Sequence, residues 1–254
     1  MLSLNPEGNK NQLQPLVSVI IPAQNEKRTI ARVIAQAKKV HPRTEVIVVA
    51  NGSTDGTARM ARRNGAKVIE FEQPLGHDVG RAIGAKAAGG QILLFIDGDF
   101  VIPAAKLKPY VKAVEQGYDI VLNRHVNAVR KKRVHPILVA KKALNILIAK
   151  PELGTASMTA IPHAISRKAF EQIGPHNLAV PPKAQAVAAS RNLRFKLGPF
   201  VNINARNARR SVVARNKVKQ LVLGDHIEAI HWWIRQFGHP RLGYSDLGRL
   251  REWA

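Results

Sequence analysis

The sequence predicts a Rossmann-like α/β fold, in which a mostly parallel β-sheet is flanked by helices on both faces. Two observations lead to this prediction. Residues 17–122 alternate short apolar runs, typical of buried strands, with segments of helical periodicity. The composition, with 45% hydrophobic and 22% charged residues in a chain of 254, is that of a globular protein with a sizeable core. Residues 123–238 are less regular and predict an irregular C-terminal half.

The elements of the first half follow from local patterns. The apolar run 17–22 ends at Pro22, as a strand buried on both faces would. In the next segment Ile30, Val33 and Ile34 recur at helical spacing, and Gly65 marks a helix end further on. The expected strands are 17–22, 45–50, 66–71, 91–96 and 118–123, and the expected helices are 26–40, 54–65, 79–90 and 103–117.

The second half contains longer helical patterns and fewer strands. Residues 135–150 predict an apolar helix that carries a lysine pair, and 158–174 predict a strand followed by a short helix. Residues 180–192 begin with a proline pair and continue as a helix. Residues 208–238 predict a long helical region in which Gly224 is a candidate break.

The positive charge is concentrated in one part of the chain. The formal net charge is +23, and residues 124–219 contain 20 Lys and Arg against two acids, Glu152 and Glu171. This localisation predicts a surface for an anionic partner, which can be nucleic acid, anionic lipid or a phosphorylated substrate. General solubility is the alternative explanation.

Other features bound the compartment and the cofactors. The absence of cysteine excludes disulfides and thiolate metal sites. The N-terminus is polar, without the apolar core of a signal peptide, and no apolar run is long enough to span a bilayer. We therefore expect a cytoplasmic protein, with peripheral contact to the inner face of a membrane as a further expectation.

Three polar clusters follow predicted strands, where ligands bind in open α/β sheets. They are "PAQNE" (22–26), "NGSTDGT" (51–57) and "DGD" (97–99). Asp97 and Asp99 repel each other unless a cation lies near them, and carboxylates at such a place favour Mg²⁺ or Mn²⁺. The alternative is an Asp-Gly turn with solvated acids, and the residues of "NGSTDGT" can equally cap the following helix.

The clusters in this order, "VSVIIPAQNE", "EVIVVANGSTDGT" and "PLGHDVGRAIGAKAAGGQILLFIDGD", resemble family 2 glycosyltransferases with the GT-A fold. The resemblance covers residues 16–122, and more weakly 164–174. It implies transfer of a sugar from a nucleotide-sugar, a UDP-sugar being the first choice, with Mg²⁺ or Mn²⁺ bridging the D-x-D carboxylates to the diphosphate. By motif position the metal ligands are Asp97 and Asp99, and the residues that bind the nucleotide-sugar are Pro22, Ala23, Asn25, Glu26, Asn51, Ser53, Gly76, Arg81 and Asp97.

Two of the departures from the family bear most directly on the chemistry. Asn51 stands where an acid is common, although its amide can still bond a base edge. The carboxylate that deprotonates the acceptor in inverting members is missing, because 175–190 contains no acid. Asp225 and Glu228, three residues apart, are the expected replacement for this catalytic base, and His226 between them is expected near the metal. The alternatives are a capped surface helix and a retaining mechanism, which needs no such base.

The resemblance also implies an organisation of the chain. Residues 16–238 form one GT-A domain, made of a nucleotide-sugar-binding half (16–122) and a basic acceptor half (123–238), between a polar extension (1–15) and a basic tail (239–254). The basic half suits an anionic, phospholipid-linked or cell-envelope acceptor, or an anionic membrane, and nucleic acid is the less favoured partner. The alternative function is a degraded, non-catalytic nucleotide-sugar-binding protein that acts as a polyanion-binding or membrane-binding module.

Overall fold

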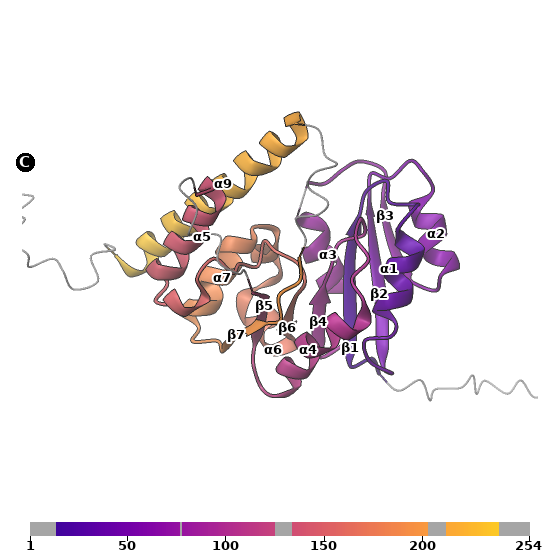
Figure 1. Ribbon diagram of the computed structural model, residues 1–254, viewed down its shortest axis with the longest axis horizontal. Helices are drawn as coiled ribbons and strands as arrows, with labels where there is room; N and C mark the ends of the chain where they lie inside the picture. Colours follow the sequence, from indigo (N-terminus) through magenta and orange to yellow (C-terminus); the bar gives the residue numbers. More distant parts are fainter. Residues whose placement is uncertain (1–13, 77, 125–133, 203–211, 239–254) are drawn as a thin grey trace, which may run out of the picture.

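The computed structural model describes residues 14–76, 78–124, 134–202 and 212–238. A seven-stranded sheet with the order β3-β2-β1-β4-β6-β5-β7 lies at its centre and is flanked by helices (Figure 1). The strands are β1 (Val17–Ala23), β2 (Thr44–Asn51), β3 (Lys67–Phe71), β4 (Ile92–Phe95), β5 (Ile120–Asn123), β6 (His163–Ser166) and β7 (Phe195–Gly198). The predicted mostly parallel α/β sheet is thereby confirmed.

The helices alternate with the strands in the first half and gather in the second. They are α1 (Ile30–Ala37), α2 (Thr57–Arg63), α3 (Val79–Ala87), α4 (Ala104–Glu115), α5 (Pro136–Leu147), α6 (Arg167–Ile173), α7 (Pro181–Ser190) and α9 (Val212–Phe237). Two short 3₁₀ helices, η2 (Pro151–Leu153) and η3 (Pro175–Ala179), precede β6 and α7. None of the described helices is long and apolar enough to cross a membrane.

The centre of the sheet is buried because successive side chains of a strand point to opposite faces and each face is covered. Val19 and Ile21 of β1 pack with α1 and α4 residues such as Val33 and Leu107. Ile20, between them, packs on the other side with residues of α3 and α6. β1 pairs in parallel with both β2 and β4, so the carboxyl ends of these three strands meet at one edge.

Two features of the second half differ from the sequence-based expectation. The predicted strand in 158–174 is present as β6, antiparallel to β4 and β5, but no periodicity indicated β7, which pairs with β5. The predicted break at Gly224 is wrong, because α9 continues through it. A helix-interior glycine costs about 1 kcal/mol relative to alanine, but His226 and Ala229 of the same helix are buried and outweigh this cost.

Helices α5, α7 and α9 form a layer of their own at the edge of the molecule (Figure 1). Its small core contains Leu144 and Ile148 from α5, Ala186 and Ala189 from α7, and Ala229 from α9. The four consecutive basic residues at 130–133 and the basic tail at 239–254 lie outside the described residues.

Candidate active site at the strand ends

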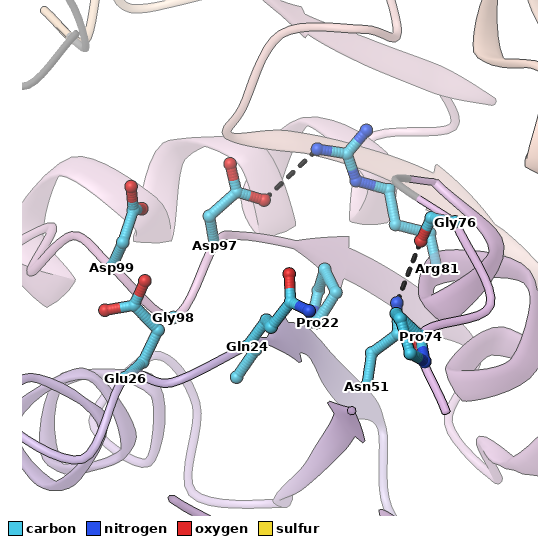
Figure 2. A pocket seen from close by; sticks show the side chains of 11 residues that line it. Pro22, Gln24, Glu26, Asn51, Pro74, Gly76, Arg81, Asp97, Gly98 and Asp99 are labelled. Atoms are coloured by element: carbon cyan, nitrogen blue, oxygen red, sulfur yellow. Dashed lines mark hydrogen bonds and ion pairs between the residues drawn. The ribbon is translucent and has the colours of Figure 1, made fainter. Parts of the chain in front are cut away.

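The carboxyl ends of β1, β2 and β4 surround a cleft with a volume of about 340 Å³. Figure 2 shows the carboxylates of Glu26, Asp97 and Asp99 at one end of the cleft and Asn51 and the turn at Gly76 at the other. The full lining is Pro22, Ala23, Gln24, Glu26, Asn51, Pro74, Gly76, Arg81, Asp97, Gly98 and Asp99. All three predicted clusters therefore contribute to one site, with the turn before α3 as a fourth wall.

The Asp97–Gly98–Asp99 turn is held close to the end of β1. The Thr29 hydroxyl donates a hydrogen bond of 2.8 Å to the Gly98 carbonyl, and the Gly98 amide donates to the Pro22 carbonyl at 3.2 Å. A Cβ at Gly98 would lie 2.9 Å from the Cβ of Ala23. Glycine is needed here for this close approach, which leaves the two carboxylates at the lip of the cleft.

Arg81, in the first turn of α3, joins two carboxylates. Its guanidinium forms an ion pair with the buried Asp78, and its Nη2 donates to Asp97 at 3.1 Å. Burial alone would lower the pKa of Arg81, but Asp78 and Asp97 together raise it, so the group stays charged. Arg81 thus places one positive charge beside the D-x-D motif and fixes the orientation of Asp97. Asp78 is a site residue that the sequence pattern did not identify, and its only signal was the position three residues before Arg81.

Asn51 shapes the other end of the cleft. Its side-chain nitrogen donates to the Gly76 carbonyl at 2.8 Å, and its side-chain oxygen accepts from the Leu75 amide at 2.7 Å. The side chain is buried, and both ends of its amide hold the 74–76 turn. In this arrangement Asn51 forms the wall of the pocket through the turn that it supports.

Asn25 and Ser53 join two loops and do not line the cleft. The backbone amide of Asn25 donates to the Ser53 hydroxyl at 3.1 Å, and the backbone amide of Thr54 donates to the side-chain oxygen of Asn25 at 2.9 Å. The Ser53 hydroxyl also donates to the Ala23 carbonyl at 3.3 Å. These bonds hold the loop after β1 against the loop after β2, and a direct contact of either residue with a nucleotide stays a prediction.

His163 of β6 lies behind the site and was not anticipated from sequence. Its ring stacks on Phe95 of β4 with centroids 4.7 Å apart, and its Nδ1 donates to the Ala160 carbonyl at 3.0 Å. Burial, followed by the charge of Arg81, lowers the pKa of His163 to about 3. The imidazole is therefore neutral, and it lies near enough to Arg81 and Asp97 to be affected by their charges.

Helix α9 carries the three residues expected to act as base and metal ligand. Burial raises the pKa of Asp225 to about 6, and repulsion from Asp78 and then Glu228 acts in the same direction. Asp225 therefore lies near enough to Asp78, the partner of Arg81, for the two charges to repel. Glu228 instead forms an ion pair of 3.0 Å with Lys183 on α7.

His226 is completely buried in the layer of α5, α7 and α9. Its Nδ1 donates to the Val222 carbonyl at 2.6 Å, which leaves Nε2 as the acceptor of a neutral ring, without a partner among the described residues. Burial lowers the pKa of His226 to about 4, and the charge of Lys141 on α5 acts in the same direction. No group of three or more His, Asp or Glu among the described residues is placed to hold a metal ion, so the structure does not bring His226 together with Asp97 and Asp99.

The donor set at the D-x-D turn nevertheless suits a hard divalent cation. Asp97 and Asp99 offer carboxylate oxygens at the open lip of the cleft, and Arg81 occupies only one oxygen of Asp97. Mg²⁺ and similar ions commonly take one or two protein carboxylates and complete their coordination with substrate phosphates and water. The two aspartates fit such an ion as part of a site that the substrate completes.

Comparison with known proteins places this geometry in a family. The family model described as glycosyl transferase family 2 matches residues 18–174. The chain belongs to glycosyl transferase family 2. Every residue of the cleft lies inside the matched segment, whereas α7, β7 and α9 lie outside it.

Matches to individual relatives also cover only part of this chain. The chain is 36% identical over 124 residues to the glycosyltransferase AglE of Haloferax volcanii, a match that covers 45% of this chain and 38% of AglE. It is 30% identical over 116 residues to the undecaprenyl-phosphate 4-deoxy-4-formamido-L-arabinose transferase of Aeromonas hydrophila, which covers 42% of this chain and 36% of that one. The matches thus span less than half of these curated relatives.

A solved family structure resembles the fold over most of its length. The glucosyl-3-phosphoglycerate synthase of Mycobacterium tuberculosis, solved in complex with Mn²⁺, UDP and glucosyl-3-phosphoglycerate, aligns with a TM-score of 0.64 at 21% identity. The alignment covers 85% of this chain and 80% of the synthase. The present chain therefore has the GT-A fold. The alignment extends into its second half, where the sequence pattern is irregular.

Proposed function

We propose that this family 2 protein transfers a sugar from a nucleotide-sugar, of the UDP type, to an acceptor that carries phosphate, with Mg²⁺ or Mn²⁺ as cofactor. The observation that carries the proposal is the cleft of about 340 Å³. Glu26, Asp97 and Asp99 line one end of it and Asn51 the other, and Arg81 also lines it. A related protein of the same fold binds UDP and Mn²⁺, and a relative is named for an undecaprenyl-phosphate acceptor.

The donor would lie along the cleft with its base at the β1–β2 end. There Pro22, Ala23 and the 74–76 turn offer apolar and backbone surfaces, and Asn51 holds the turn in place. The diphosphate would then lie near Asp97 and Asp99, where a divalent ion would supply positive charge next to the leaving group. Arg81 holds Asp97 in the orientation needed there and adds a second positive charge.

Asp225 is the proposed base for the acceptor hydroxyl. A pKa of about 6 lets this carboxylate be ionised at neutral pH and still accept a proton effectively. Glu228 is less suited, because its ion pair with Lys183 directs it towards α7. The role of His226 as a metal ligand would require α9 to move, since its ring is buried between α9 and α5.

Substitution of Asp99 tests the proposal. Asp99→Asn should abolish sugar transfer and weaken nucleotide-sugar binding mainly when Mn²⁺ or Mg²⁺ is present, because the amide binds a cation far less well than a carboxylate. Calorimetric titration of UDP-sugars with and without Mn²⁺ measures this, together with product analysis on polyprenyl phosphate. Glu115→Gln, at an exposed carboxylate near the end of α4, is the matched control.

Two results would contradict parts of the proposal. Unchanged turnover in Asp99→Asn would exclude the metal role. Binding of nucleotide-sugars by the wild type without transfer to any phosphorylated acceptor would instead favour the non-catalytic alternative, which the absence of any acid in 175–190 keeps open.

A further inference from the structure

The outward side of α5 has an unusual distribution of polar and apolar residues. Figure 1 shows α5 at the opposite end of the molecule from α2. The exposed residues of segment 135–149 recur at helical spacing and form what we call the α5 outer face, made of His135, Pro136, Val139, Lys142, Ala143, Ile146 and Ala149. Val139 and Ile146 are 54% and 46% exposed.

The buried side of the same helix is more polar than its outer face. Lys141 and Asn145 point inward, where the Asn145 amide donates to the carbonyls of Gly154 and Ala156 and accepts from Gln185. A surface helix normally shows the reverse pattern, with apolar residues inside and charged residues outside. Single exposed apolar residues need no explanation, but a continuous stripe of them on one helix face indicates a binding surface.

Charge decides which occupant suits this face. Its ionisable side chains are Lys142 and His135, neither of them an acid, and α5 contains no acid over its 12 residues. Lys150 follows the helix, and the surrounding segment 124–219 has 20 basic residues against two acids. An apolar stripe with basic neighbours is the pattern of helices that lie in the interface of anionic bilayers.

The area of the face argues against a stable dimer. A helix of 12 residues is about 18 Å long and about 10 Å wide, so its outer side offers on the order of 200 Å². A specific protein interface needs roughly 800 Å² from each partner. A lipid surface has no such requirement, because a few apolar side chains and the attraction of cations to anionic headgroups are enough for reversible binding.

We propose that the α5 outer face docks on an anionic lipid bilayer, with Val139 and Ile146 inserted among the acyl chains and Lys142 at the headgroups. Helix α5 packs against α9, which carries Asp225, so a docked α5 would bring the acceptor half of the molecule to the lipid surface. The inference narrows the proposed phosphate-carrying acceptor to one held at a lipid surface, but it does not depend on catalysis and is tested without donor or acceptor.

The experiment uses the full chain and two kinds of vesicle, pure phosphatidylcholine and a mixture with phosphatidylglycerol. The wild type should sediment with the mixed vesicles and much less with the neutral ones. The double variant Val139→Gln/Ile146→Gln should partition roughly tenfold or more weakly into mixed vesicles, since two apolar anchors are lost. Phe200→Gln is the matched control, because Phe200 is 43% exposed and follows Pro199, whose carbonyl accepts from Tyr110 of α4.

A site-specific probe distinguishes insertion from adhesion through other basic surfaces. The chain contains no cysteine, so Val139→Cys and Phe200→Cys each accept one environment-sensitive fluorophore. The label at 139 should shift to shorter wavelength on mixed vesicles, and the label at 200 should not. The proposal is wrong if the double variant binds as the wild type does, or if the label at 139 stays in water while the protein is bound. It is also wrong if the wild type binds no vesicle, or if light scattering shows a dimer that the double variant dissociates.

Discussion

At the scale of single residues, the site depends on the buried positive charge of Arg81 and the carboxylates that pair with it. Arg81 and Asp78 are each about 6% exposed, and Arg81 also pairs with Asp97. A buried ion pair adds little to stability by itself, but removal of one partner leaves the other as an uncompensated charge. The arrangement that orients Asp97 is therefore also one on which the fold depends.

Arg81→Met should lower the free energy of unfolding by about 3 kcal/mol, because Asp78 stays buried without its cation. Arg62→Met is the matched control. Arg62 forms an ion pair of similar type with Glu70, but the two side chains are 54% and 42% exposed, and such surface pairs contribute about 1 kcal/mol or less. Urea denaturation of both variants measures the difference, and an equal loss in the two would show that burial of Arg81 has no energetic role.

Asp225→Asn should increase stability and decrease activity. The pKa of Asp225 is raised from 3.8 to about 6 in the folded state. The contribution of this carboxyl group to the free energy of unfolding is therefore fully present below 3.8 and is lost as the pH rises through about 6. At neutral pH the variant should be more stable by on the order of 1 kcal/mol, after a discount for partial solvent exposure, and the gain should vanish in acid.

The same variant should reduce kcat by about 100-fold or more if Asp225 is the base, and wild-type activity should fall as the pH drops below about 6. Glu228→Gln serves as the comparison, because Glu228 is paired with Lys183 at the surface. Thermal unfolding across pH and steady-state kinetics are the two measurements. If Asp225→Asn increased stability without reducing turnover, Asp225 would not be the base, and its charge would affect only the stability of the fold.

At the scale of elements, the two halves of the molecule follow different rules. In the first half the strands are mostly apolar runs, apart from the edge strand β3 with its exposed Lys67 and Glu70, and the helices cover the faces of the sheet. Local pattern and tertiary structure therefore agree there. In the second half α9 passes through Gly224 without a break, because contacts with α5 and α7 override local propensity.

Glycines inside two helices make this contrast measurable. A Cβ at Gly224 would meet nothing within 4 Å, so Gly224→Ala should stabilise the protein by about 1 kcal/mol through helix propensity alone. A Cβ at Gly84 of α3 would lie 2.5 Å from Cγ2 of Ile20, so Gly84→Ala should destabilise it by about 1–3 kcal/mol. Chemical denaturation of both variants measures the two changes in the free energy of unfolding. Destabilisation by Gly224→Ala would mean that α9 does not continue through this position.

At the scale of the whole molecule, charge is divided between the halves. The cleft contains more carboxylates than cations, whereas residues 124–219 have 20 bases and two acids. A nucleotide-sugar bound with a divalent ion suits the first environment, and a phosphorylated acceptor suits the second. The division between donor half and basic acceptor half stays a proposal.

Reversal of charge at Arg130, Lys131, Lys132 and Arg133 to Glu should weaken binding of phosphorylated acceptors and of anionic vesicles, and the difference should shrink at high salt. Sedimentation at two ionic strengths measures this, with Lys106, Lys108, Lys112 and Lys86 reversed in the same way as a control outside the basic segment. Equal effects of the two quadruple variants would attribute the attraction to net charge and not to its location.

The sequence alone determined the strands of the first half, the cleft edge and the D-x-D turn, because these depend on short-range patterns: apolar runs that end in polar residues, and glycine where chains approach closely. The polar residues at the strand ends, Asp97, Asp99 and Glu26, therefore belong to one site by pattern as well as by geometry. The pairing of β7 with β5 was decided by tertiary structure. Tertiary structure alone decided what the other polar residues do. Asn25, Ser53 and Asn51 proved to hold loops, and His226 proved to be buried. Asp78 proved to pair with Arg81, and His163 proved to be a buried neutral ring stacked on Phe95. The physical reason is that burial, pKa and hydrogen-bond partners arise from residues far apart in sequence, which no local pattern encodes.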